Sequence, residues 1–262
     1  MKKTIVLRAL APFAFLGLLA GTARAADVHV MISAGFFGVY AQLGPKFEKA
    51  TGHHLVTVRG PSMGDSPEAI PTRLARGEPA DVVILDGEKA DELAKQGLVR
   101  DGKVVLAKSL IGVCVKEGAP KPDISTVEAF KKTLLAAKSI AYSDSGSGTY
   151  ISTRMFKQLG IEDQVAGKSR KVRGPPSGEP VAAVIARGEA EIGFQQVSEI
   201  IHVPGISYVG PAPAEVQPGF TFAGAITKNA QAPEAARALL QYLSSPEAAE
   251  TITKAGLAPA TP

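Results

Sequence analysis

The clearest sign of architecture in this chain is Asp81-Val82-Val83-Ile84-Leu85, where four apolar residues follow one another and a helical pattern over 88–96 comes next. A strand that is apolar at every position is buried on both faces, which is typical of a parallel sheet in an α/β fold. Two further strands, at 28–32 and 55–58, flank a helix at 39–49. Together these segments predict a parallel sheet covered by helices on both faces.

A second series of alternating strands and helices starts after this sheet. Its strands are predicted at 109–115, 139–142 and 190–194, its helices at 126–137, 150–159 and 179–187, and a last strand (220–226) and two helices (233–243 and 246–255) follow. The last elements return most simply to the first half, so the chain should cross twice between two lobes, near Ala107 and near Phe220. We expect lobe 1 to comprise residues 26–107 plus 222–262 and lobe 2 residues 108–221. The ligand cleft should lie between them, where strand C-terminal ends and helix N-termini meet.

Residues 1–25 have the three parts of a secretory signal peptide. A basic start is followed by an apolar run over 9–20, too short to span a bilayer, and by the small-x-small sequence Ala23-Arg24-Ala25. The segment holds four of the 29 basic residues and none of the 25 acidic ones, which leaves 25 of each sign in the mature chain. We expect cleavage after Ala25, a periplasmic protein, and no nucleic-acid or anionic-membrane partner.

Cys114 is the one cysteine of the chain, so no intramolecular disulfide can form, and its strand-like surroundings predict a buried side chain. The sequence has no Walker A, S-x-x-K or H-E-x-x-H pattern, and its four histidines are scattered. We therefore expect neither a metal ion nor another cofactor.

Serine- and glycine-rich loops occur at four places where strands end or helices begin: 33–37, 60–66, 143–149 and 174–179. Serine hydroxyls together with free backbone N–H groups at helix N-termini can hold an anion without a cationic side chain. Arg59, which ends the second strand beside the second loop, could also grip a carboxylate, or it could be solvated or ion-paired. These loops predict a small-anion site in the cleft.

The second loop also contains Gly60-Pro61-Ser62-Met63-Gly64, the G-x-S-x-G pattern of a serine hydrolase. Asp144 and His202 follow in the order of an α/β-hydrolase triad. That pattern requires a helix directly after Ser62, whereas Asp65-Ser66-Pro67 intervenes here. A secreted hydrolase built on Ser62 therefore stays an alternative to a binding protein.

Several segments are similar to one known family: SAG at 33–35, ARGEPADVVI at 75–84, KPDIS at 121–125 and AKSIAY at 137–142. With the signal peptide, they resemble the molybdate-type periplasmic solute-binding proteins of ABC importers over essentially the whole mature chain. The resemblance implies an α/β fold of two lobes with an interlobe cleft, the periplasmic binding protein type II. It also implies a monomer that closes on a small anion and delivers it to the cognate ABC permease in the inner membrane.

The same resemblance implies which residues touch the ligand. Neutral hydroxyl donors fall on Ser33 and Ser62, backbone donors fall on the helix starts of the third and fourth loops, and Gln196 stands where the family has a tyrosine. The predicted ligand-binding residues are Ser33, Gly35, Phe36, Arg59, Ser62, Met63, Ser147, Gly148, Thr149, Ser177, Gly178 and Gln196.

The departures from the family concern the ligand. Bulky Phe36, the longer second loop with Met63, and Gln196 in place of tyrosine favour a small organic acid over molybdate, and both ligands stay open. We expect reversible binding without turnover, and therefore a transport protein and not an enzyme. A binding protein that serves a sensor instead of an importer is a further alternative.

Overall fold

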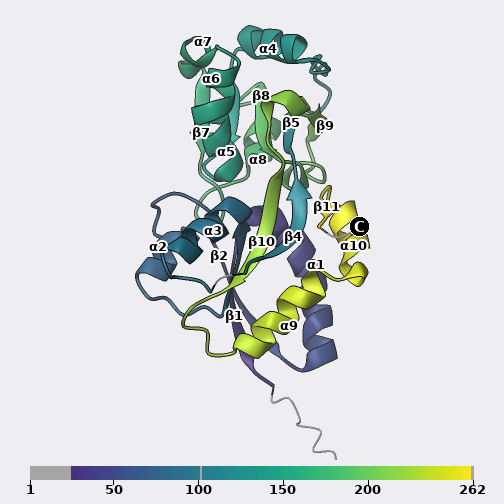
Figure 1. Ribbon diagram of the computed structural model, residues 1–262. Helices are drawn as coiled ribbons and strands as arrows, with labels where there is room; N and C mark the ends of the chain where they lie inside the picture. The colour runs from purple at the N-terminus through teal and green to yellow at the C-terminus, as the bar shows by residue number, and fades with distance from the viewer. Residues whose placement is uncertain (1–24, 101, 261–262) are drawn as a thin grey trace, which may run out of the picture.

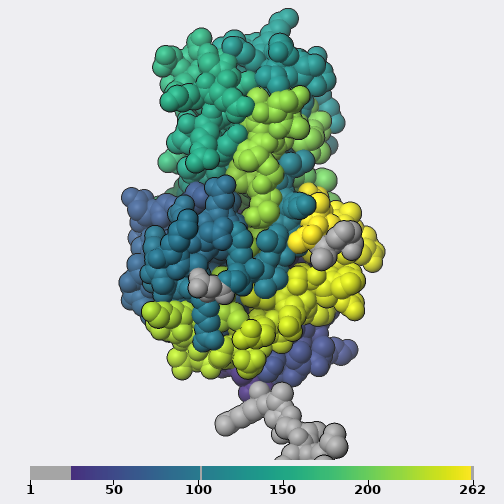
Figure 2. All heavy atoms as spheres, in the orientation of Figure 1, coloured from purple at the N-terminus to yellow at the C-terminus, as the bar shows by residue number. Residues whose placement is uncertain are grey.

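The computed structural model describes residues 25–100 and 102–260, so nearly all of the predicted signal peptide lies outside the described residues. Two sheets, each packed with its own helices, form two α/β lobes one above the other (Figure 1), which confirms the predicted fold class. Figure 2 shows the two lobes in contact at the waist of the molecule. No helix within the described residues is long and apolar enough to cross a membrane.

Lobe 1 is built on a six-stranded sheet with the order β11-β4-β10-β3-β1-β2. Its strands are β1 (Asp27–Ile32), β2 (His54–Arg59), β3 (Val82–Asp86), β4 (Val104–Ser109), β10 (Phe220–Ile226) and β11 (Ala258–Pro259), and its helices are α1 (Ala34–Thr51), α2 (Ile70–Ala75), α3 (Gly87–Lys95), α9 (Pro233–Leu243) and α10 (Pro246–Lys254). The three strands that predicted a parallel sheet, β1, β2 and β3, do pair in parallel, whereas β10 runs antiparallel to β3 and β4. The reason is that β10 belongs to the segment that returns from lobe 2 and enters the sheet from the opposite end.

Lobe 2 is built on a five-stranded sheet with the order β7-β6-β8-β5-β9. Its strands are β5 (Ile111–Lys116), β6 (Ile140–Ser143), β7 (Ser169–Val172), β8 (Ile192–Gln196) and β9 (Ile206–Pro211), and its helices are α4 (Val127–Ala136), α5 (Gly146–Tyr150), a π-helical turn (Ile151–Met155), α6 (Phe156–Gln158), α7 (Glu162–Ala166) and α8 (Val181–Ala186). Short 3₁₀ turns cover Val197–Glu199 and Ala214–Val216. The chain passes from β4 to β5 at Leu110 and returns between β9 and β10.

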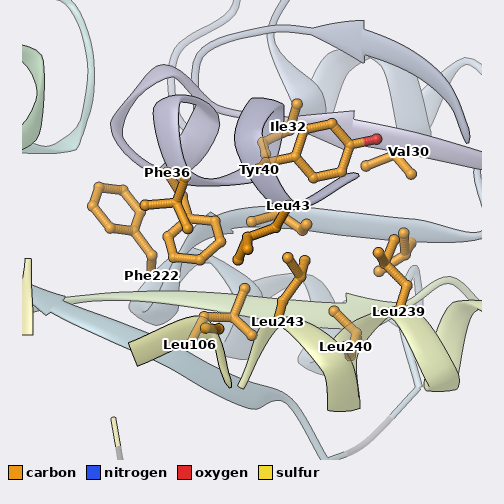
Figure 3. Close-up of a cluster of buried hydrophobic side chains, with 14 of the residues drawn as sticks. Val30, Ile32, Phe36, Tyr40, Leu43, Leu106, Phe222, Leu239, Leu240 and Leu243 are labelled. Carbon is orange, nitrogen blue, oxygen red and sulfur yellow. The ribbon is translucent and has the colours of Figure 1, made fainter. Parts of the chain in front are cut away.

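The core of lobe 1 forms where α1 and α9 meet over the sheet (Figure 3). Phe36, Tyr40 and Leu43 share one face of α1, and Leu240 of α9 lies across from them. The ring of Phe36 is 6.3 Å from the ring of Phe222 on β10 and is fully buried. Phe36 therefore belongs to this core, because its helix face turns toward the sheet, and it packs behind Phe222 without lining the cavity itself.

Asp81 connects three parts of lobe 1. Its side chain is 2% exposed; one oxygen accepts the N–H of His29 at 2.8 Å, and the other accepts the N–H groups of Gln231 at 2.6 Å and Ala232 at 2.8 Å. The carboxylate thereby joins β1 and the residues that precede α9 to the start of β3. The Gly-Glu-Pro-Ala-Asp segment, in which Asp81 is the last residue, thus has a structural role.

Cys114 lies on β5 with no exposed surface, as predicted, and burial raises the pKa of its thiol to about 12. Because the thiolate is the reactive form, the folded protein should not react with maleimide or an aromatic disulfide reagent at pH 8. One thiol per chain should react in 6 M guanidinium chloride. Rapid labelling of the folded protein would contradict the buried position.

Candidate functional site

A cavity lies between the lobes, at the ends of β1, β2 and β3 on one side and of β6 and β8 on the other. It is lined by Ser33, Ala34, Gly35, Pro61, Ser62, Asp86 and Phe222 of lobe 1 and by Ser143, Asp144, Ser145, Gly146, Gly174, Pro175, Gln195, Gln196 and Glu199 of lobe 2. The cavity has a volume of about 30 Å³, which is room for water but not for a larger molecule. A larger ligand therefore requires the lobes to move apart.

Ser33 stands between β1 and α1 and points a hydroxyl at this cavity. It is 4% exposed, and its Oγ has no hydrogen-bond partner among the described residues. A buried hydroxyl without a partner costs about 1–3 kcal/mol, so a ligand atom is the partner that this position calls for. Ala34 and Gly35, which open α1, add the positive end of the helix to the same wall.

Ser62 supplies a second hydroxyl from lobe 1. It is 3% exposed, and its Oγ accepts the backbone N–H of Asp86 at 3.1 Å, which leaves the hydroxyl hydrogen available to a ligand. The carboxylate of Asp86 caps α3 by accepting the N–H groups of Glu88 at 3.0 Å and Lys89 at 3.4 Å, and burial raises its pKa. Asp86 thus holds the helix start beside the ligand space.

The serine-hydrolase alternative is not supported by this arrangement. His202 is exposed, and its Nε2 lies 2.7 Å from the backbone oxygen of Lys254, on the outside of the molecule. Ser62 faces the cavity with Asp86 as its neighbour, and among the described residues that line the cavity no histidine is placed to accept its proton.

In lobe 2, the loop after β6 turns three serines toward one another. The Oγ of Ser143 lies 2.8 Å from that of Ser145 and 3.3 Å from that of Ser147. The helix that starts at Gly146 continues from α5 through the π-helical turn into α6, so a long helix directs its N-terminus at the cavity. Ser145 and Gly146 line this wall, whereas Ser147 uses its hydroxyl within the serine cluster.

Two further predicted contacts of this loop lie elsewhere. Gly148 packs against the backbone, since a Cβ added there would sit 1.6 Å from the carbonyl oxygen of Ser143. Thr149 lines a separate, wider interlobe groove of about 800 Å³, together with Met63. Met63 lies close to Gly146 of lobe 2: a Cβ added at Gly146 would be 3.6 Å from the Cε of Met63.

The fourth loop meets the cavity through Gly174 and Pro175 and not through the predicted Ser177 and Gly178. Ser177 is exposed, and Gly178 turns tightly against the carbonyl oxygen of Arg173, 2.0 Å from the position of an added Cβ. The start of α8 gives no free donor at Val181, because its N–H is bonded to Oε1 of a glutamine, Gln195, at 3.0 Å. Ser177 and Gly178 therefore lie outside the cavity.

Gln196 lines the cavity at the end of β8, as its position predicts. Its Oε1 accepts the hydroxyl of Ser109 at 2.6 Å, so the amide NH₂ is the end that remains to donate toward a ligand. A glutamine held in this way can take the donor role of a phenol. Ser33, Gly35, Ser62 and Gln196 are thus the predicted residues that the structure brings together.

Glu199, in the 3₁₀ turn after β8, is a lining residue that the sequence analysis missed. Its Oε1 accepts the amide of Gln195 at 2.8 Å. Burial raises the pKa of Glu199 to about 7, against the opposing effects of the Gln195 hydrogen bond and the charge of Arg59. A single acidic residue in a turn forms no sequence pattern. The one signal available was that Glu199 follows the end of a predicted strand closely, where a cleft residue is expected.

Arg59 neither lines the cavity nor lies in solvent. Its guanidinium carbon is 4.1 Å from the centre of the Phe37 ring, a cation–π contact, and its buried Nε has no hydrogen-bond partner among the described residues. Burial lowers its pKa, while Glu199 raises it. Arg59 thus acts on the cavity through its charge.

In the described part of the chain, no group of histidine, cysteine, aspartate and glutamate residues could hold a metal ion.

Comparison with known proteins agrees with this geometry. Residues 28–258 match the profile of a family described as bacterial extracellular solute-binding protein. The chain is 28% identical to the molybdate-binding protein ModA of Azotobacter vinelandii, over 92% of this chain and 93% of that one. The solved periplasmic molybdate-binding protein of Azotobacter vinelandii superposes with a TM-score of 0.70 at 24% identity, over 88% of this chain and 98% of that one.

A third relative corrects one expectation. The chain is 49% identical to a protein of a Pseudomonas species named aconitate isomerase, over 88% of this chain and 87% of that one. The expectation of binding without turnover, that is, of no enzymatic activity, is therefore wrong. It failed because it rested on the lack of a nucleophile or metal-site pattern, and an enzyme that uses neither a nucleophile nor a metal ion has no such pattern. By fold, cavity and sequence, the chain belongs to the bacterial extracellular solute-binding proteins, of the molybdate-binding type.

Proposed function

We propose that this protein interconverts the cis and trans isomers of aconitate, propene-1,2,3-tricarboxylate. The observation that carries the proposal is the cavity, which combines neutral donors suited to carboxylates with Glu199, the one of its three lining carboxylates whose pKa is about 7. The 49% identity to a protein named aconitate isomerase supports the same substrate. The small organic acid favoured by the sequence thus becomes a tricarboxylate.

The donors around the cavity match a polycarboxylate. The N-termini of α1 and α5 direct backbone N–H groups at it from opposite lobes. The hydroxyls of Ser33 and Ser62 and the amide of Gln196 add three side-chain donors. Several carboxylate groups can therefore be held at once without a buried ion pair.

Substrate entry requires the lobes to separate, because aconitate is far larger than a cavity of about 30 Å³. We assign residues 26–107 plus 222–262 to one moving body and residues 108–221 to the other. Among the contacts that join the bodies within the described residues, two polar ones lie near the cavity: Arg173 and Glu68 form an ion pair at 2.9 Å, and Ser198 Oγ donates to the carbonyl oxygen of Gly35 at 2.7 Å. Both must break in the open form.

A second function is favoured by family membership: delivery of the bound anion to an ABC permease by a monomeric periplasmic protein. The same donors would then hold a carboxylate or molybdate without chemistry. The predicted signal peptide fits this second function, which requires a protein outside the cytoplasm, whereas isomerisation sets no requirement on location.

Incubation of the purified mature chain with cis-aconitate, followed by proton NMR, tests the first function. We expect trans-aconitate to appear at a rate proportional to protein concentration. In thermal-shift measurements, tricarballylate, the saturated analogue, should stabilise the protein by about 2.7 kcal/mol at 100 times its dissociation constant. Molybdate is the control ligand; a large shift with molybdate and no isomerisation would contradict the proposal and support transport.

A further inference from the structure

We propose that Glu199 carries a proton between the two terminal carbons of the substrate, and that Gln195 and Arg59 position it and keep it ionised. This assignment rests on the proposed isomerisation. It concerns a residue in no predicted motif, chosen among the three carboxylates that line the cavity.

The other two carboxylates are committed to backbone groups. Asp86 caps α3 through two N–H groups, and Asp144 Oδ1 accepts the N–H of Gly174 at 3.0 Å. Protonation of either one would loosen the helix start or the loop that it holds during every turnover. Glu199 is hydrogen-bonded to the Gln195 side chain and to the backbone of Gln196, both within its own turn and the strand before it. It caps no helix and ties down no loop from another element, so it can gain and lose a proton while the walls of the cavity stay in place.

Gln195 fixes the direction of the Glu199 carboxylate. It is 2% exposed, and its Oε1 accepts the N–H of Val181, so its amide group cannot turn over without loss of that bond. Its Nε2 must therefore present a donor to Glu199 Oε1. A carboxylate has about four acceptor sites, so this bond leaves room for a proton from the substrate.

The charges that face Glu199 come from three elements. Arg59 on β2 favours its ionised form, Asp144 after β6 disfavours it, and the Gln195 side chain and the backbone of Gln196 on β8 favour it by hydrogen bonding. No ion pair joins Arg59 to Glu199 within the described residues. Because Arg59 acts from a distance on the Phe37 ring, it stabilises the carboxylate without blocking it.

The chemical step needs no other reactant. The Glu199 carboxylate takes a proton from the methylene carbon: a C–H bond breaks, an O–H bond forms, and the electron pair spreads over three carbons and their carboxylates. The same proton then returns to the other terminal carbon, where a C–H bond forms and the carboxylate is regenerated. The double bond has moved by one carbon, the skeleton is unchanged because its two ends are equivalent, and the conformation held in the site decides between cis and trans.

Glu199→Gln tests the assignment, with Glu215→Gln, an exposed residue of another 3₁₀ turn, as the matched control. We expect Glu199→Gln to lower kcat by about 10²–10⁴-fold while calorimetry shows tricarballylate binding close to that of the unmodified protein. Glu215→Gln should leave both unchanged. If the unmodified protein does not isomerise aconitate, the proposed function fails; if it does and Glu199→Gln keeps its rate, only the assignment of Glu199 fails.

The pH dependence of kcat/KM gives a second test, which remains possible even if one of the variants does not fold. Activity should fall below pH 7, because the protonated Glu199 cannot accept a proton. Arg59→Leu and Gln195→Leu each remove a group that favours the ionised form of Glu199. The pH below which activity falls, the acid limb of the profile, should therefore rise by roughly one pH unit. Arg59→Lys should keep the limb in place. If the activity of the unmodified protein does not fall below pH 7, Glu199 is not the base. If the pH profile of Arg59→Leu is not shifted, Arg59 does not act on Glu199.

Discussion

Replacement of Asp81 with alanine is expected to lower the free energy of unfolding by about 3–5 kcal/mol. The variant leaves three backbone N–H groups, those of His29, Gln231 and Ala232, without the acceptor that they share. The stability of a domain is about 5–15 kcal/mol, so this one change removes much of it. Urea unfolding followed by circular dichroism measures the loss.

Asp91→Ala is the control for this experiment. Asp91 is an exposed residue of α3 that pairs with Lys103 at 2.6 Å. A surface pair of this kind contributes about 0–1 kcal/mol. Equal losses for the two aspartates would show that the buried carboxylate does not hold β1 and α9 together.

The second large effect is expected from Gly148→Ala, with a loss of about 3 kcal/mol or more. The added Cβ would meet the carbonyl oxygen of Ser143 at 1.6 Å, and that atom belongs to the backbone, so the turn between β6 and α5 must open. Because Ser145 and Gly146 line the cavity on this turn, tricarballylate binding should weaken as well. Thermal unfolding and calorimetry measure the two losses.

Gly38→Ala provides the matched glycine control. Gly38 lies inside α1, is exposed, and has no atom within 4 Å of an added Cβ. Alanine there should stabilise the protein by about 0.5–1 kcal/mol, because it restricts the unfolded chain and favours the helix. A Gly148→Ala protein as stable as the unmodified one would contradict the tight turn.

Much of the fold could be predicted because its elements have local signals. The apolar run at 82–85 gave β3, and the Pro-initiated segments at the C-terminus gave α9 and α10. The strands β7 and β9 were missed: β7 reads Ser-Arg-Lys-Val and is an edge strand, so neither apolar run nor alternation marks it. β4 was partly merged with β5, because Leu110 separates them without any turn signal.

The candidate site could be predicted where loops have a composition of their own. Ser33, Gly35 and Ser62 belong to such loops and do line the cavity. Glu199 could not be found in this way, because two of the groups that act on its pKa, Arg59 and Asp144, are far from it in the sequence. The same limit would hide an enzyme of the kind proposed above: proton transfer needs one carboxylate in the right surroundings, and surroundings are a property of the tertiary structure.

The position of β10 has a consequence for synthesis. It lies between β3 and β4 and yet comes more than a hundred residues after both, so these strands have no partner between them until Phe220–Ile226 has emerged from the ribosome. Until then a nascent chain exposes the backbone N–H and C=O groups of two apolar strand edges, which are templates for aggregation. Fragments that end before Phe220 should therefore aggregate, and lobe 1 folds after translation of the C-terminal segment, not during synthesis of its first half.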